Sequence, residues 1–342
     1  MHRTLIALSV AAATALVGAP ATAVAGPQCG DTITASTTLT KDLTCTGDAL
    51  TVIAGPGAGH IVLNFNGHSI TGPGLASTPW HTAIVTDDTS GDPASSIDLV
   101  GGTITGFGSA LISVNGNSGG PQNLTVRRMT FTDNYQWSAR GVAGQYRVQN
   151  SRFTNSGNGG VRSGGHLTVT NSTFVNSSVG STSSSSTSVY GSSFTGASIT
   201  TGGDSDLTVV GTTIRNCNYG LDLSGVRAAS IRGNRIEGCN RGIRLTGSRQ
   251  ASVIEGNQIL NSAFIGMEYT AGVEPITIIG NTFNKSGSDG LTGTGSGVTI
   301  TSNTAEKNGS LGISVTDATD GGGNVARKNT DPRQCTGVVC SS

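Results

Sequence analysis

The chain has 342 residues, of which 52 are Gly, and it carries 20 Lys plus Arg against 20 Asp plus Glu. Charged residues make up 12% and aromatic residues 4%, which excludes helical bundles and coiled coils. A protein that follows a phosphate backbone needs a surplus of Lys and Arg, so zero net charge argues against a nucleic-acid partner. Val, Ile and Thr recur throughout, and we therefore expect a β protein with many short strands and turns rather than a disordered chain.

Residues 1–25 are expected to be a signal peptide. Arg3 is followed by an apolar run from Thr4 to Val17, and a small-x-small sequence, Ala23-Val24-Ala25, comes just before Gly26. This order is typical of secretory signals, and the run is too short to span a bilayer comfortably. No other long apolar run occurs in the sequence. We therefore expect a secreted protein with no membrane partner.

A repeat of 20 to 24 residues runs through most of the chain. One apolar column is Phe131, Phe153, Phe174, Phe194, Ile214, Ile236, Ile259, Phe283 and Ala305. Five residues before each member lies a β-branched residue: Val126, Val148, Val169, Val189, Val209, Ile231, Ile254, Ile278 and Ile300. The neighbours of these columns are mostly polar, and such a period of two indicates strands. Gly-Asn recurs between the segments at 233–234, 256–257 and 280–281, which predicts turns with a ladder of Asn amides.

Three short strands and three turns in each repeat predict one coil of a parallel β-helix, with coils about 4.8 Å apart. The pairs Phe65 with Ile70 and Leu99 with Ile104 extend the five-residue offset upstream, which gives about eleven coils. We expect an N-terminal cap at 26–60, the β-helix at 61–325 and a C-terminal cap or tail at 326–342. Longer intervals predict outward loops around 79–81, 87–92 and 115–121, because surplus residues in a solenoid leave on one face.

The six cysteines form three pairs in the sequence: Cys29 with Cys45, Cys217 with Cys239, and Cys335 with Cys340. An even number in an exported protein favours disulfides. The outer pairs are expected to clip the two ends of the stack. The middle pair holds equivalent positions in adjacent coils, so we expect either a disulfide or two stacked free thiols. No pair has Cys-x-x-Cys spacing and no His lies beside them, so no zinc site is predicted.

The repeat N-x-I-x-x-N/C-x-x-G-I-x-L and the string NGHSITG at 66–72 resemble the right-handed parallel β-helix proteins of the pectate-lyase-like superfamily. The arrangement is also similar to exported actinobacterial β-helix proteins. The resemblance covers about residues 60–315 and implies a single right-handed solenoid. It implies no particular activity, because this fold carries enzymes, adhesins and tailspikes alike. Asp87-Asp88 matches part of the polygalacturonase pattern, but the Gly-His-Gly and Arg-x-Lys motifs of those enzymes are absent from the sequence.

One segment concentrates the residues that suit a site. Residues 99–203 hold six Arg against a single acid, Asp133, and a cationic band suits a polyanionic saccharide. Elimination at a uronic acid needs a base and a cation on the carboxylate, and aromatic faces suit sugar rings. The predicted catalytic residues are Asp133, Arg127, Arg147 and Arg152. The predicted substrate-binding residues are Trp80, Tyr135, Trp137 and Arg140.

Two functions remain open on the sequence alone. The first is an extracellular protein that binds an acidic polysaccharide and cleaves or modifies it, as a lyase or epimerase does. The alternative is a non-catalytic β-helix with a surface, adhesive or structural role. No cofactor is expected apart from Ca²⁺, for which Asp87, Asp88 and Asp92 supply oxygen ligands. Whether Asp133, Arg127, Arg147 and Arg152 converge in one groove distinguishes the two.

Overall fold

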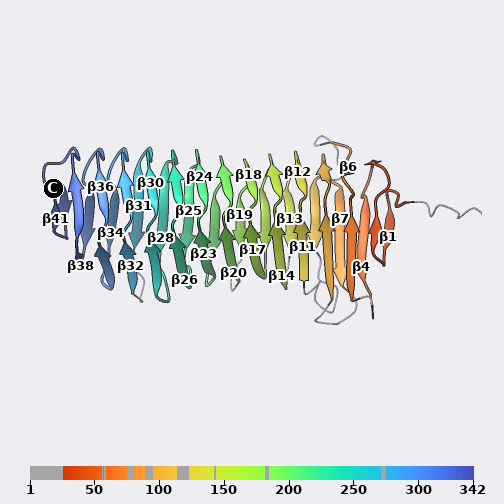
Figure 1. The fold of residues 1–342 in the computed structure, drawn as a ribbon, viewed down its shortest axis with the longest axis horizontal. Coiled ribbons are helices and arrows are strands. Elements are labelled where there is room, and N and C mark those ends of the chain that lie inside the picture. The colour runs from red at the N-terminus through yellow and green to blue at the C-terminus, as the bar shows by residue number, and fades with distance from the viewer. Residues whose placement is uncertain are drawn as a thin grey trace, which may run out of the picture.

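The computed structural model describes residues 26–55, 57, 59–74, 80–88, 95–113, 123–141, 144–181, 185–270 and 275–342. Every regular element among them is a strand, and the strands stack into one long rod (Figure 1). Successive strands pass in turn to three sheets, and all pairs are parallel, so three strands make one coil. The predicted all-β parallel β-helix is confirmed. The described residues contain no helix with the length and apolarity needed to cross a bilayer.

Sheet 1 has fourteen strands: β1 (Asp31–Ile33), β4 (Leu50–Ala54), β7 (Thr82–Asp88), β10 (Ser109–Ser113), β13 (Trp137–Gly141), β16 (Gly159–Ser163), β19 (Val179–Ser181), β22 (Ile199–Gly202), β25 (Tyr219–Ser224), β28 (Arg241–Thr246), β31 (Ile265–Thr270), β34 (Leu291–Thr294), β37 (Ile313–Thr316) and β40 (Cys335–Thr336). Sheet 2 has thirteen: β2 (Thr37–Thr38), β5 (His60–Asn64), β8 (Ser96–Val100), β11 (Asn123–Arg127), β14 (Gln145–Gln149), β17 (His166–Thr170), β20 (Ser186–Tyr190), β23 (Asp206–Val210), β26 (Ala228–Arg232), β29 (Ser252–Glu255), β32 (Ile276–Ile279), β35 (Val298–Thr301) and β38 (Thr319–Gly322). Sheet 3 has fourteen: β3 (Leu43–Thr44), β6 (Ser69–Thr71), β9 (Thr103–Thr105), β12 (Thr130–Thr132), β15 (Arg152–Thr154), β18 (Thr173–Val175), β21 (Ser193–Thr195), β24 (Thr213–Arg215), β27 (Arg235–Glu237), β30 (Gln258–Leu260), β33 (Thr282–Asn284), β36 (Thr304–Glu306), β39 (Asn324–Arg327) and β41 (Cys340–Ser341).

The stack is longer than the eleven coils counted in the sequence. Strands β1 to β4 already belong to it, within the segment expected as an N-terminal cap, and β40 and β41 add to the other end. The predicted position of Phe65 in the inward column of sheet 2 is wrong, because Leu63 pairs with Leu99 there. The turn at Asn66 and Gly67, both at positive φ, makes this coil longer by two residues and breaks the five-residue offset.

The inward columns predicted from the repeat form the core. Each member of both columns is at most 1% exposed. Phe131, Phe153, Phe174 and Phe194 stack with ring centres 4.6–4.8 Å apart and planes within 6° of parallel. This distance equals the coil rise, so the ring stack and the backbone ladder share one spacing. Burial of these side chains is the main source of stability for the rod.

Buried amides line the corner between sheets 2 and 3. Each Asn in the series Asn234, Asn257, Asn281, Asn303 and Asn324 is at most 2% exposed. The backbone N–H of each donates to the side-chain oxygen of the next at 2.9–3.0 Å, and the side-chain amide donates to the same oxygen at 2.9–3.3 Å. The predicted amide ladder is confirmed. It satisfies polar groups that would otherwise be buried without a partner.

All three expected disulfides are present: Cys29–Cys45, Cys217–Cys239 and Cys335–Cys340. The sequence left stacked free thiols open for the middle pair, and the structure shows the bond. The outer two lie near the two ends of the rod, as expected. The middle one joins adjacent coils at the turn that leads into sheet 1.

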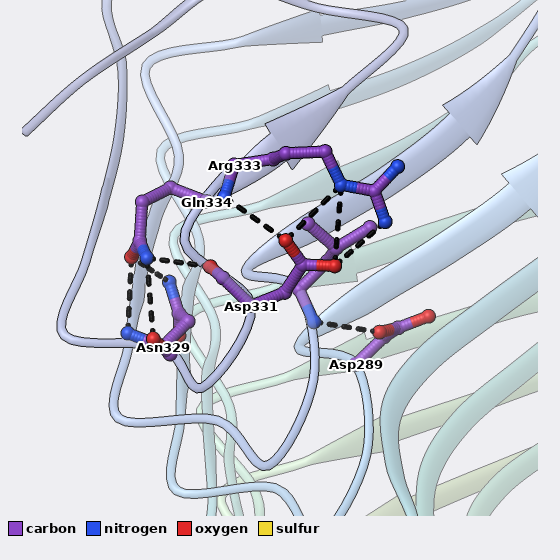
Figure 2. Close-up of polar contacts among 6 residues, drawn as sticks. Asp289, Asn329, Asp331, Arg333 and Gln334 are labelled. Atoms are coloured by element: carbon purple, nitrogen blue, oxygen red, sulfur yellow. Dashed lines mark hydrogen bonds and ion pairs between the residues drawn. The ribbon is translucent and has the colours of Figure 1, made fainter.

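Polar side chains close the C-terminal end of the rod (Figure 2). The side-chain oxygen of Gln334 accepts the backbone and amide N–H groups of Asn329 at 3.0 Å, the role that an Asn of the next coil has elsewhere. The Arg333 guanidinium donates to Asp331 at 2.6–3.2 Å, and the backbone N–H of Arg333 donates to it at 2.9 Å. Hydrogen bonds from this side chain, then from this N–H, lower the pKa of Asp331 to about 2.

The amide ladder predicts the effect of Asn257→Ala. The substitution leaves the buried N–H groups of Asn234 without their acceptor, so we expect the free energy of unfolding to fall by about 1–3 kcal/mol. Denaturant unfolding measures it. The control is Asn240→Ala, whose exposed amide donates to Asn218 at 3.3 Å and whose loss should cost no more than about 0.5 kcal/mol. Equal losses in the two variants would contradict a structural role for the buried ladder.

The low pKa of Asp331 gives a second prediction. Its folded pKa lies below the ordinary value of about 3.9, so the interaction stabilises the fold above that pH and is lost as pH falls toward 2. Arg333→Ala removes the main donor, and the pKa of Asp331 should then rise toward its ordinary value. Carbon-13 NMR titration of the carboxyl group measures this. An unchanged titration in the variant would show that Arg333 does not cause the shift.

Candidate functional site

The residues predicted to be catalytic lie on two faces of the rod. Arg127 and Arg147 project from sheet 2, on β11 and β14, whereas Arg152 begins β15 in sheet 3 and Asp133 directly follows β12. Arg127 donates to Asp98 at 2.6 Å, and that carboxylate also lies 3.4 Å from His60. The structure therefore does not bring the four together on one face. Residues close together along a coil point outward from different sides of the prism.

Two other predicted catalytic residues, Arg147 and Asp133, also form hydrogen bonds with nearby side chains. Arg147 donates to Asn123 at 3.2 Å and to Gln145. Asp133 accepts the amide of Asn155 at 3.0 Å, one coil further on, and the hydroxyl of Thr132 at 3.1 Å. The contacts with Asn123 and Asn155 are hydrogen bonds between surface side chains of adjacent coils.

The four residues predicted to bind substrate all lie on sheet 1 or on the turn that leads into it. Trp80 precedes β7, Tyr135 precedes β13, and Trp137 and Arg140 belong to β13. The rings of Trp80 and Tyr135 are tilted by 41° with centres 4.9 Å apart, although their strands are two coils apart. Both are about half exposed, at 52% and 45%. They form an exposed aromatic pair beside sheet 1.

Two glycines make room for these rings. A Cβ at Gly108, in the coil between Trp80 and Tyr135, would lie 2.5 Å from the Trp80 Cβ. A Cβ at Gly159 would lie 2.4 Å from the ring of Trp137, and Gly159 also has a φ of +146°. Trp137 pairs in register with Gly159. Its ring therefore covers the next strand of the sheet, where any side chain would displace it.

Arginine side chains continue the same face. Arg140 pairs in register with Arg162 on β16, and the Arg162 guanidinium carbon lies 5.3 Å from the ring centre of Trp137. Both Arg residues are exposed, and neither forms an ion pair with a side chain in the described part of the chain. The sequence named Arg140 for the site and missed Arg162. The signal was available, because Arg162 lies 22 residues after Arg140, one repeat away.

The loops expected beside this face are mostly outside the described residues. Segments 75–79, 89–94 with Asp92, and 114–122 with the whole 115–121 loop are among those not described. Asp87 belongs to β7, and Asp88 ends it. Across the residues that the structure does describe, no group of three His, Cys, Asp or Glu side chains is arranged to hold a metal ion. The expected Ca²⁺ ligands therefore remain a sequence-based expectation.

The fold and this face define a parallel β-solenoid with three disulfides and an aromatic and cationic strip on one sheet. The family model for the right handed beta helix region matches residues 110–272 and 196–340, so the chain belongs to that family. No curated protein matches the sequence significantly.

Several solved structures are similar to this chain at low sequence identity. The surface protein and adhesin PfbA of Streptococcus pneumoniae is 15% identical, with a TM-score of 0.46 over 85% of this chain and 89% of that one. The A-module of the Azotobacter vinelandii mannuronan C-5 epimerase AlgE4 is 14% identical, with a TM-score of 0.46 over 92% and 91%. The periplasmic alginate epimerase AlgG is 12% identical, with a TM-score of 0.45 over 80% and 77%.

Proposed function

We propose that this protein binds an acidic polysaccharide outside the cell, along the N-terminal half of sheet 1. The observation that carries the proposal is a pair of exposed guanidinium groups, Arg140 and Arg162, which form no ion pair with the described side chains and lie beside three aromatic rings on one face. Arg holds carboxylates in a bidentate manner, and Trp or Tyr faces stack on sugar rings. Three disulfides and the expected signal peptide support a location outside the cytoplasm.

Like charges in register support binding over a purely structural role. Arg140 and Arg162 occupy neighbouring coils, about 4.8 Å apart along the stack, where like charges destabilise a sheet. An anionic ligand removes that repulsion, and the rings of Trp137 and Tyr135 add apolar contact.

We propose binding rather than cleavage as the function of this face. The residues predicted to be catalytic, Asp133, Arg127, Arg147 and Arg152, belong to sheets 2 and 3. A saccharide on sheet 1 follows the axis of the rod and so passes along a different side. The second candidate function is that of a non-catalytic adhesive or structural β-helix. A finding that the protein has no affinity for acidic glycans would favour this second candidate.

Binding is tested by titration calorimetry with polygalacturonate, alginate and hyaluronate, with neutral dextran as a control. We expect affinity for at least one acidic polymer and none for dextran. The affinity should fall as salt rises toward physiological strength, because exposed charges are screened beyond about 8 Å there. Lack of binding to every acidic polymer at low salt would refute the proposal.

The position of the face is tested with Arg162→Ala. Loss of a hydrogen-bonding charge costs about 1.5–3 kcal/mol, so the affinity should fall about tenfold or more, with the melting temperature nearly unchanged. The matched control is Arg152→Ala on sheet 3. Arg152 is also exposed and forms no ion pair with the described side chains. The opposite result, a loss with Arg152→Ala alone, would move the site to sheet 3.

A further inference from the structure

A second aromatic cluster lies further along sheet 1. Tyr219 begins β25, Arg241 begins β28 in register with it, and Phe264 directly precedes β31. The Arg241 guanidinium carbon lies 5.7 Å from the ring centre of Tyr219 and 4.9 Å from that of Phe264. One cation is thus held between two rings from three successive coils. We call Tyr219, Arg241 and Phe264 the distal platform.

Neighbouring contacts hold the distal platform in place. The Cys217–Cys239 disulfide joins the two coils two residues before Tyr219 and Arg241. Arg241 also donates to the Tyr219 hydroxyl at 3.3 Å and lies 3.3 Å from the carboxylate of Glu268. A surface whose side chains are already fixed loses little conformational entropy when a ligand binds. The platform is therefore preorganised.

Charges around the distal platform cancel, in contrast to those at Arg140 and Arg162. Arg244 donates to Asp222 at 2.7 and 2.8 Å, and its guanidinium carbon lies 4.6 Å from the Tyr219 ring. With Arg241 paired to Glu268, two cations face two anions. The platform therefore suits the apolar face of a sugar ring and has no spare cation for a carboxylate.

The exposure of Phe264 distinguishes this cluster from an ordinary ion-pair surface. Its side chain is 43% exposed although it is purely apolar. Five large hydrophobic side chains are exposed among the described residues, and three of them, Trp80, Tyr135 and Phe264, occupy the turn that leads into sheet 1. The aromatic exposure of this protein is thus concentrated along one edge of one sheet, as a linear ligand requires.

Between the coil of Arg162 and that of Asp222, the described residues of the outward column that contains both are small. From Arg162 the register passes through Gly180 and Thr200 to Asp222. Four coils separate β13 from β25, a distance of about 19 Å. We propose that the distal platform binds a second ring of the same polysaccharide chain that Arg140 and Arg162 hold. This inference rests on the proposed function and adds a second contact to it.

Two contacts with one chain make polymer binding stronger than binding of a fragment, because the second contact forms at a high effective concentration. The test compares the wild type with Phe264→Ala on polygalacturonate and its trisaccharide, and on alginate and its trisaccharide. A trisaccharide bound at Trp137 on β13 is too short to reach Phe264, which precedes β31 six coils away, at about 29 Å. We expect Phe264→Ala to lower polymer affinity by about tenfold or more and to leave trisaccharide affinity at the Trp137 face unchanged.

Tyr190→Ala is the matched control, since Tyr190 is an exposed aromatic residue, at 38%, on β20 of sheet 2. It should bind polymer as the wild type does. Wild-type polymer affinity in Phe264→Ala, together with a loss in Arg162→Ala, would overturn the distal platform and leave the proposed function standing. Equal losses of polymer and trisaccharide affinity would overturn the two-contact arrangement. No binding of either polymer by the wild type would refute both.

Discussion

Stacking of equivalent residues at the coil spacing is the constraint on which this structure depends. Each strand residue of an inner coil has, about 4.8 Å above and below it, the residue at the same place in the neighbouring repeat. A position is therefore stable only if it tolerates its own copy or meets a complementary residue. The Phe column does so by parallel ring packing. The Asn corner does so because an amide is both donor and acceptor.

Surface charges obey the same rule over most of the rod. Arg232 with Glu255 and Arg327 with Glu306 pair one coil apart. Two columns depart from this rule: Arg140 lies above Arg162, and Lys285, Lys307 and Lys328 occupy one turn position in three successive coils. Proteins retain such unfavourable arrangements where binding needs them. Arg140 and Arg162 differ from the Lys column in the aromatic rings beside them, and the proposed binding face rests on that combination.

The features that recur in every repeat could be predicted from the sequence. The sheet from which an outward side chain projects could not. The columns, the amide ladder and the contact between Cys217 and Cys239 follow from spacing alone, since a fixed period places equivalent residues in contact; whether that pair forms a disulfide did not follow from it. The common face of the predicted catalytic residues did not follow, because Arg147 and Arg152 are five residues apart yet lie on different sheets. Phe65 was misplaced for a related reason, since the two-residue extension at Asn66 and Gly67 is conformational and leaves the apolar pattern intact.

A second column of buried amides, Asn308 and Asn329 at the corner between sheets 3 and 1, ends in a way that bears on how molecules meet one another. Gln334 accepts both N–H groups of Asn329, and its own amide nitrogen donates back to the carbonyl of Asp331 at 2.6 Å (Figure 2). An open parallel edge is a template on which further strands, including those of other chains, add without limit. Here the last donors at this corner are used within the chain. At this corner the amide column therefore ends within the chain and offers no free amide to a further strand.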